Sequence, residues 1–101
     1  MYDNIQVILK KMKIRVRYFG NISLKLGKKE ETFCLNGSPH IGDLLKSIVE
    51  RYGEGYRALF YLGNEAEEPG ILITKNKALV GKEERLSDGD EVSLIPVVSG
   101  G

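Results

Sequence analysis

The carboxyl-terminal end of the chain carries the residues best suited to chemistry. After Glu91 the sequence holds no further charged side chain and closes on Gly100-Gly101. Glycine has no Cβ, so a Gly-Gly end can thread a narrow channel and adopt backbone angles closed to other residues. A terminal α-carboxyl group has a pKa near ~3.5, so it is ionised at neutral pH and able to attack an activated phosphate of ATP. The resulting acyl-adenylate would accept a thiol or an amine.

The last four residues, 98–101, have the length needed to enter another protein. In extended form they reach about 13 Å, at ~3.3 Å per residue. This is the right scale to place a carboxylate inside a partner's active site. The plain alternative is a frayed terminus whose two glycines have no role.

Conventional catalytic side chains are scarce. The chain has one histidine, His40, and one cysteine, Cys34. We interpret His40 as a surface or helix-capping residue and Cys34 as a small buried hydrophobic side chain within a strand. Glu65, Glu67 and Glu68 are interpreted as a solvated loop, because adjacent carboxylates repel one another and lack fixed geometry. The sequence therefore predicts no metal site and no resident cofactor.

Size and composition limit the class of protein. The 101 residues, 11.3 kDa, suit one domain, and 42% hydrophobic residues are too many for a disordered chain. A net charge of +1 lacks the basic excess of a nucleic-acid binder. No apolar run approaches the ~20 residues of a membrane span, and residues 1–11 do not read as a secretory signal. We expect a cytoplasmic protein with no nucleic-acid or membrane partner.

The elements that must position the tail begin with two strands. Apolar and charged residues alternate over residues 13–19, which predicts a strand with one buried face. Phe19 falls on the outward face of that strand. A second strand is expected at residues 31–35, joined to the first by a hairpin turn at residues 27–29.

The spacing of apolar residues then changes to that of a helix. Residues 40–52 predict an amphipathic helix, with Ser38 as its N-cap, Pro39 in its first turn and Gly53 as its end. Residues 56–62 fit either a short helix or an irregular apolar segment.

Short strands are expected at residues 71–74, 78–80 and 91–98, with a tight turn at residues 86–90. Strands on either side of one long helix predict an α+β roll, with a mixed sheet of four to five strands and one main helix across it. The first strand must then pair with the last, which brings both chain ends to neighbouring strands.

Residues 1–11 allow two interpretations. Ile5, Val7 and Leu9 alternate as they would in an extra edge strand. Terminal segments are commonly unattached, however, which favours a loose arm. We therefore divide the chain into an arm at residues 1–11, a domain at residues 12–97 and a flexible tail at residues 98–101.

The last strand is predicted to expose apolar residues next to the tail. If the face with Val92 and Leu94 packs on the core, Ile95 and Val97 point outward. Phe19 lies on the same outward face, in the strand paired with this one. A contiguous exposed apolar patch usually marks a docking surface. The alternative is that a loop or the amino-terminal arm covers it.

Taken together, the sequence resembles a known family in four segments: KIRVRYFG, IGDLLKSIVERY, ILITKNKALV and LSDGDEVSLIPVVSGG. They are similar to the ubiquitin-like β-grasp sulfur carriers, in particular the MoaD-like small subunits of molybdopterin synthase and the small archaeal modifier proteins. The similarity spans residues 12–101. One departure is that the Pro-Pro step with aromatics often found in the last strand is replaced here by Leu94-Ile95-Pro96-Val97.

The resemblance implies a ubiquitin-like β-grasp fold and a role for the tail. A ubiquitin-activating-type adenylyltransferase would use ATP to adenylate Gly101, and sulfur delivery would convert it to a thiocarboxylate. The thiocarboxylate would donate sulfur to a pterin precursor in the large subunit of molybdopterin synthase. The chain would then be a sulfur-donating subunit and not a stand-alone enzyme.

The site residues follow from the resemblance and the predicted register together. The functional tail would be Gly100 and Gly101. Partner contact is assigned to Phe19, Ile95, Val97, Val98 and Ser99. Two alternatives stay open: a protein modifier joined to lysines through the same glycine, and a non-covalent β-grasp interaction module whose terminal glycines are incidental.

Overall fold

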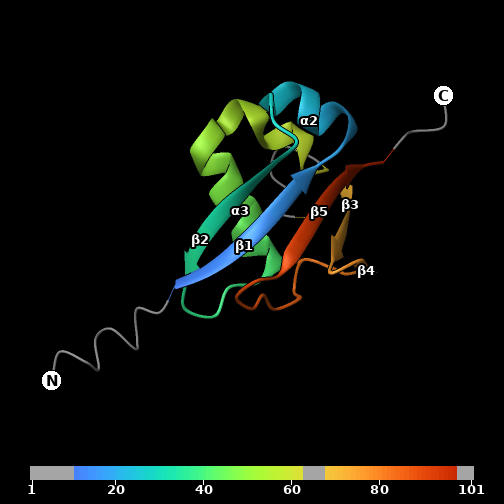
Figure 1. Cartoon of the computed structure of the whole chain (residues 1–101). Helices are drawn as coiled ribbons and strands as arrows, with labels where there is room; N and C mark the ends of the chain where they lie inside the picture. Colours follow the sequence, from blue (N-terminus) through green and yellow to red (C-terminus); the bar gives the residue numbers. More distant parts are fainter. Residues whose placement is uncertain (1–10, 63–67, 98–101) are drawn as a thin grey trace, which may run out of the picture.

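The sheet of this protein has five strands in the spatial order β2-β1-β5-β3-β4 (Figure 1). It was obtained as a computed structural model, which describes residues 11–62 and 68–97. β1 runs parallel to β5, and the other neighbouring pairs are antiparallel. The strands are β1 (Lys11–Tyr18), β2 (Glu30–Asn36), β3 (Ile71–Lys75), β4 (Ala78–Leu79) and β5 (Glu91–Pro96).

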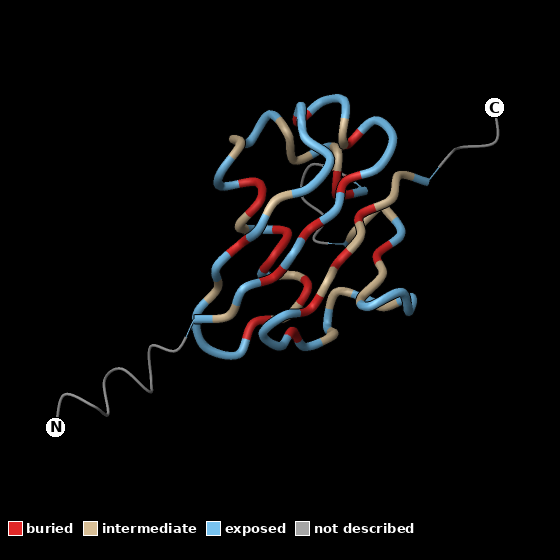
Figure 2. The backbone as a smooth tube through the Cα atoms, viewed as in Figure 1, coloured by how far each residue is buried: buried red, intermediate tan, exposed pale blue. Residues whose placement is uncertain are grey.

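One face of the sheet is covered by the main helix, α3 (Ile41–Tyr52), which crosses behind the strands in Figure 1. The helix buries its apolar stripe against the inward residues of β1 and β5 because its hydrophobic positions recur at helical spacing. Figure 2 shows buried and exposed residues alternating along β1. The most completely buried residues include Ile14, Val16, Leu44, Leu45, Ile48, Phe60, Val92 and Leu94. The expected α+β roll of ubiquitin-like β-grasp type is confirmed.

The pairing of the first and last strands is also confirmed. In the parallel β1–β5 ladder, Arg15 lies beside Glu91 and Tyr18 lies beside Leu94. The backbone N–H of Phe19 continues the ladder by donating to the carbonyl of Leu94 at 3.2 Å. The end of β1 is therefore fixed next to the end of β5.

The connection between β1 and β2 is more than the hairpin turn predicted at residues 27–29. It contains a second helix, α2 (Gly20–Leu26), which buries Ile22 and Leu26. Two buried residues four positions apart give too short a periodic signal to separate a helix from a turn. The helix ends at Gly27, whose φ of 73° suits a left-handed cap.

The N-cap of α3 lies two residues later than predicted. The N-cap is His40 and not Ser38, and the His40 backbone N–H donates to the Asp43 carboxylate at 2.8 Å. A carboxylate three residues into a helix satisfies one of its unpaired N–H groups, so Asp43 decides where the helix begins. The predicted end at Gly53 is confirmed.

Of the two interpretations left open for residues 56–62, the helical one holds in part, because a 3₁₀ helix, η1, spans Glu54–Leu59. η1 follows α3 directly in the chain. Within the described residues, no helix has the length and apolar character required to cross a membrane.

Cys34 is exposed, so the prediction of a buried side chain was wrong. Alternation in β2 turns Phe33 into the core, with 2% exposure, and Cys34 to the opposite face. The sequence here reads Thr-Phe-Cys-Leu, in which three consecutive apolar residues hide the alternation.

A nearly buried carboxylate joins β1 and β2 to α3. Glu31 of β2 accepts hydrogen bonds from the Tyr18 hydroxyl at 2.5 Å and the Tyr52 hydroxyl at 2.6 Å. Arg51 and Lys28 contact its other oxygen at 3.1 and 3.3 Å. Burial by itself raises the pKa of Glu31, but the hydrogen bonds from the two tyrosines and Lys28 outweigh it and hold that pKa below its usual value. Glu31 thus fixes the end of β1 relative to the helix.

Candidate functional site

The strand that leads into the tail is β5, in the centre of the sheet. It ends at Pro96, and Val97, the next residue, is 57% exposed. The predicted tail residues Val98, Ser99, Gly100 and Gly101 lie outside the described residues. The described residues define the surface around the end of β5.

Around this departure point, on the sheet face opposite α3, lie five apolar residues, here called the apolar patch: Phe19, Leu72, Leu79, Ile95 and Val97. Strand register explains their grouping. Leu72 of β3 is the cross-strand partner of Ile95. Phe19 follows Tyr18, the partner of Leu94, and so lies beside Ile95 on the other side of β5. Cross-strand neighbours on one face are about 5 Å apart, so Phe19, Ile95 and Leu72 form one surface. Leu79 lies farther out on the same face, opposite Thr74 of β3.

The outward orientation predicted for Phe19 and Val97 is confirmed, since Phe19 is 38% exposed and Val97 57%. Ile95 is half-buried among its neighbours on the same face. Whether these residues contact a partner remains a prediction. Within the described part of the chain the patch is not covered by a loop.

Two members of the apolar patch were missed from sequence. Leu72 sits in the run Ile-Leu-Ile, which gives no indication of which residue faces outward. Pairing with Ile95 settles this, and Leu72 is 45% exposed. Leu79 is 70% exposed and pairs with Thr74 of β3, which lies on the same face of the sheet as Leu72. Only the register between strands could have identified either residue.

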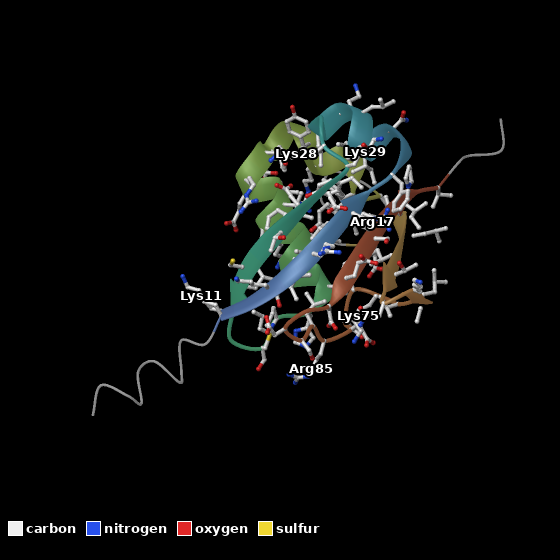
Figure 3. The ribbon with its side chains drawn as sticks, viewed as in Figure 1. Lys11, Arg17, Lys28, Lys29, Lys75 and Arg85 are labelled. Carbon is white, nitrogen blue, oxygen red and sulfur yellow. The ribbon has the colours of Figure 1, made fainter. Side chains whose placement is uncertain are left out.

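Beside the apolar patch, the outward face of β1 is basic. Lys11, Lys13, Arg15 and Arg17 are all exposed because the period-2 alternation places them opposite the buried Ile14, Val16 and Tyr18. Arg15 is 3.8 Å from the Glu91 carboxylate. Figure 3 labels Lys11 at the start of β1 and Arg17 near its end.

The remaining sequence candidates do not join this surface. His40 caps α3 and lies 3.5 Å from the Asp43 carboxylate. Glu68, the one described member of the acidic run, contacts Lys82 at 2.8 Å. Among residues 11–62 and 68–97, no group of three histidine, cysteine or acidic side chains is arranged to hold a metal ion. The described surface around the end of β5 is therefore made of apolar and basic side chains.

Comparison with known proteins agrees with the fold described above. The model of the ThiS family matches residues 16–101. The molybdopterin synthase sulfur carrier subunit of Chlamydomonas reinhardtii is 33% identical over 90 residues, which covers 89% of this chain and all of that protein.

Two solved structures are similar to this chain in fold and sequence. The small archaeal modifier protein 1 of Methanosarcina acetivorans is 27% identical with a TM-score of 0.70, covering 91% of this chain and 99% of that one. The complex of subunits 1 and 2 of the molybdopterin-converting factor from Helicobacter pylori contains a chain 32% identical with a TM-score of 0.52, covering 89% and 100%. By family match, sequence identity and fold, the protein belongs to the ThiS family of ubiquitin-like β-grasp proteins, which comprises sulfur carriers and protein modifiers.

Proposed function

We propose that this protein is a sulfur carrier for molybdopterin synthesis, acting as the small subunit of molybdopterin synthase. One observation carries the proposal. The apolar patch lies around β5, the strand whose continuation is the Gly100-Gly101 tail. A partner that docks on Phe19, Ile95 and Val97 is thereby held where the tail departs.

The chemistry proceeds at the carboxylate of Gly101. An activating adenylyltransferase joins this carboxylate to the α-phosphate of ATP and releases pyrophosphate. Hydrosulfide then attacks the acyl carbon and displaces AMP, and loss of the proton leaves a thiocarboxylate. In this proposal the activating enzyme supplies the catalytic groups for these steps. The carrier supplies a side-chain-free end, which passes through a channel too narrow for a Cβ, and a surface that binds the enzyme acting on it.

The partner that unloads the sulfur is proposed to be a large subunit of molybdopterin synthase. The supporting comparison is the Helicobacter pylori complex, in which a similar chain is bound to subunit 2 of the molybdopterin-converting factor. An apolar patch of this kind stabilises a complex mainly through removal of apolar area from water, with a few central residues contributing most of the binding energy.

A second candidate function is protein modification. It is favoured by the similarity to the small archaeal modifier protein of Methanosarcina acetivorans. The activated tail is the same, but the acceptor of the acyl group is a lysine amine instead of a sulfur nucleophile. The apolar patch would then serve the conjugating machinery.

Deleting Gly100 and Gly101 tests whether the tail carries the function. The truncated chain should fail to support molybdopterin formation in a reconstituted system with the large subunit. Its free energy of unfolding should equal that of the full chain, because both glycines lie beyond β5 and the described core. Unimpaired molybdopterin formation by the truncated chain would instead favour the non-covalent interaction module.

A separate experiment distinguishes sulfur carrier from modifier. Protease digests of cells that produce the protein are searched by mass spectrometry for lysines bearing the remnant of this tail. The proposal expects thiocarboxylated carrier and no such lysines. Lysine conjugates without thiocarboxylate would favour the modifier.

A further inference from the structure

The surface next to the apolar patch contains a hollow of about 460 Å³ where β1, α2 and the start of β2 meet. Its walls include Arg17, Phe19, Leu24, Lys29 and Glu30. Phe19 belongs to the apolar patch as well, so the hollow extends that patch around the end of the sheet towards α2. Figure 3 shows Arg17 and Lys29 together at this end of the molecule.

One side of the hollow is apolar. Phe19 is 38% exposed and Leu24 is 79% exposed, which makes Leu24 the most exposed of the large hydrophobic residues in the described part of the chain. α2 has to present one face to solvent because it buries Ile22 and Leu26 on the other. A leucine on the solvent side gains nothing for folding, so it is available to a partner.

The other side of the hollow is cationic. The Arg17 guanidinium lies over the Phe19 ring, 5.5 Å from its centroid, a contact that restrains the arginine next to the apolar wall. Lys29 is exposed. Its neighbour Lys28 contacts Glu31 at 3.3 Å, whereas no ion pair within 4.0 Å joins Arg17 or Lys29 to a carboxylate within residues 11–62 and 68–97.

Glu30 is the cross-strand partner of Arg17 and supplies one carboxylate to the hollow. Two cations against one carboxylate leave an excess of positive charge. Covering these cations with a neutral surface would remove water from them without compensation, at a cost in binding free energy. A carboxylate at the same place gives charge-assisted hydrogen bonds, for which the planar guanidinium of Arg17 is well suited.

We propose that this hollow receives a segment of the large subunit in which an apolar side chain lies next to an Asp or Glu. The apolar side chain packs on Phe19 and Leu24, and the carboxylate contacts Arg17 and Lys29. This inference rests on the proposed function. It names the large subunit because the hollow adjoins Phe19, beside the strand that delivers the tail, so a protein that binds the tail also covers it.

The test measures binding of the full-length carrier to the molybdopterin synthase large subunit of the same organism by calorimetry. Arg17→Glu and Lys29→Glu should each weaken binding by about tenfold or more, since close charge pairs at interfaces contribute strongly. Leu24→Ser should weaken it severalfold. Lys25→Glu is the matched control. Lys25 is an exposed cation of α2, next to Leu24 in the sequence, and it does not line the hollow. It should bind like the wild type.

A second measurement identifies the occupant. A photo-reactive benzoylphenylalanine placed at position 24 should cross-link to the large subunit, at a peptide that contains an apolar residue within two positions of an acidic one. The position lies on the solvent face of α2, so the substitution leaves the core intact.

The outcomes distinguish failure of the hollow as a docking site from failure of the proposed function. Binding by the wild type together with unchanged binding by the Arg17, Lys29 and Leu24 variants would overturn the hollow as a docking site and leave the proposed function standing. A cross-link to a segment without acidic residues would overturn the charge argument. Absence of any binding by the wild type, under conditions where its tail is thiocarboxylated, would overturn both.

Discussion

Gly20 at the start of α2 lies directly against Pro96 at the end of β5. A Cβ at position 20 would be 2.8 Å from the Pro96 Cγ, closer than packed atoms approach one another. The φ angle of Gly20 is +54°, in the left-handed region that favours glycine. This contact fixes where β5 ends relative to α2, and hence where the tail leaves the sheet.

Gly20→Ala is therefore expected to destabilise the protein. The cost combines a strained φ with displacement of Pro96, and amounts to roughly 1–3 kcal/mol of unfolding free energy. Urea unfolding measures it. Gly55→Ala is the matched control, because no atom lies within 4 Å of the added Cβ and its φ is not positive. Equal stability of the two variants would show that the contact between Gly20 and Pro96 does not constrain the fold.

Glu31→Gln is expected to remove about 2 kcal/mol of stability near neutral pH, since it weakens charge-assisted hydrogen bonds to a nearly buried carboxylate. The sign of the pH dependence follows from the lowered pKa of Glu31 in the folded protein. Because the pKa of Glu31 is lower in the folded than in the unfolded protein, its ionised form stabilises the fold at pH values above the unfolded-state pKa. This stabilisation is lost as the pH falls through the pKa of the folded protein. The difference between wild type and variant should shrink in acid. A difference independent of pH would contradict the ionised role of Glu31.

Tyr52 should keep its proton well above the usual tyrosine range. Burial, together with the hydrogen bond donated to Glu31, raises its pKa to about 12. Folding thus favours the neutral phenol of Tyr52. The stabilisation that this hydrogen-bonded phenol gives the folded protein is lost as the pH rises through its pKa in the folded state. Comparing the ultraviolet titrations of wild type and Tyr52→Phe isolates this group. In the Glu31→Gln variant its pKa should fall back towards 10, and an unchanged value would contradict the assigned cause.

Ile95→Lys is expected to weaken binding of the large subunit by about tenfold or more, which corresponds to ~1.4 kcal/mol or above. The substitution places a charge at the centre of the apolar patch, opposite Leu72. Leu62→Lys is the control, because Leu62 is an exposed apolar residue that lies outside the sheet. Calorimetry gives both affinities. Wild-type affinity of the Ile95 variant would exclude the patch as the docking surface.

Much of this architecture could be predicted from the sequence where the pattern was regular. The alternation in β1 determined its buried face and the outward position of Phe19, and the helical spacing of α3 determined the main helix. The pairing of β1 with β5 followed from the order of elements.

The features that escaped prediction share a physical cause. Cys34 and Leu72 stand in unbroken apolar runs, so the face they occupy depends on pairing with a neighbouring strand. α2 is too short to show helical spacing, and its position depends on contacts with the core made by Ile22 and Leu26. The hollow beside Leu24 could not be foreseen without that helix.

The central claim is that the carboxyl group of Gly101 is chemically activated and loaded with sulfur. It is tested most directly by the intact mass of the purified protein after incubation with its activating adenylyltransferase, ATP and a sulfur donor. The account predicts a gain equal to the replacement of one oxygen atom by sulfur, located in the last peptide and absent when Gly100 and Gly101 are deleted. An unchanged mass with an adenylyltransferase proven to recognise this protein would contradict it.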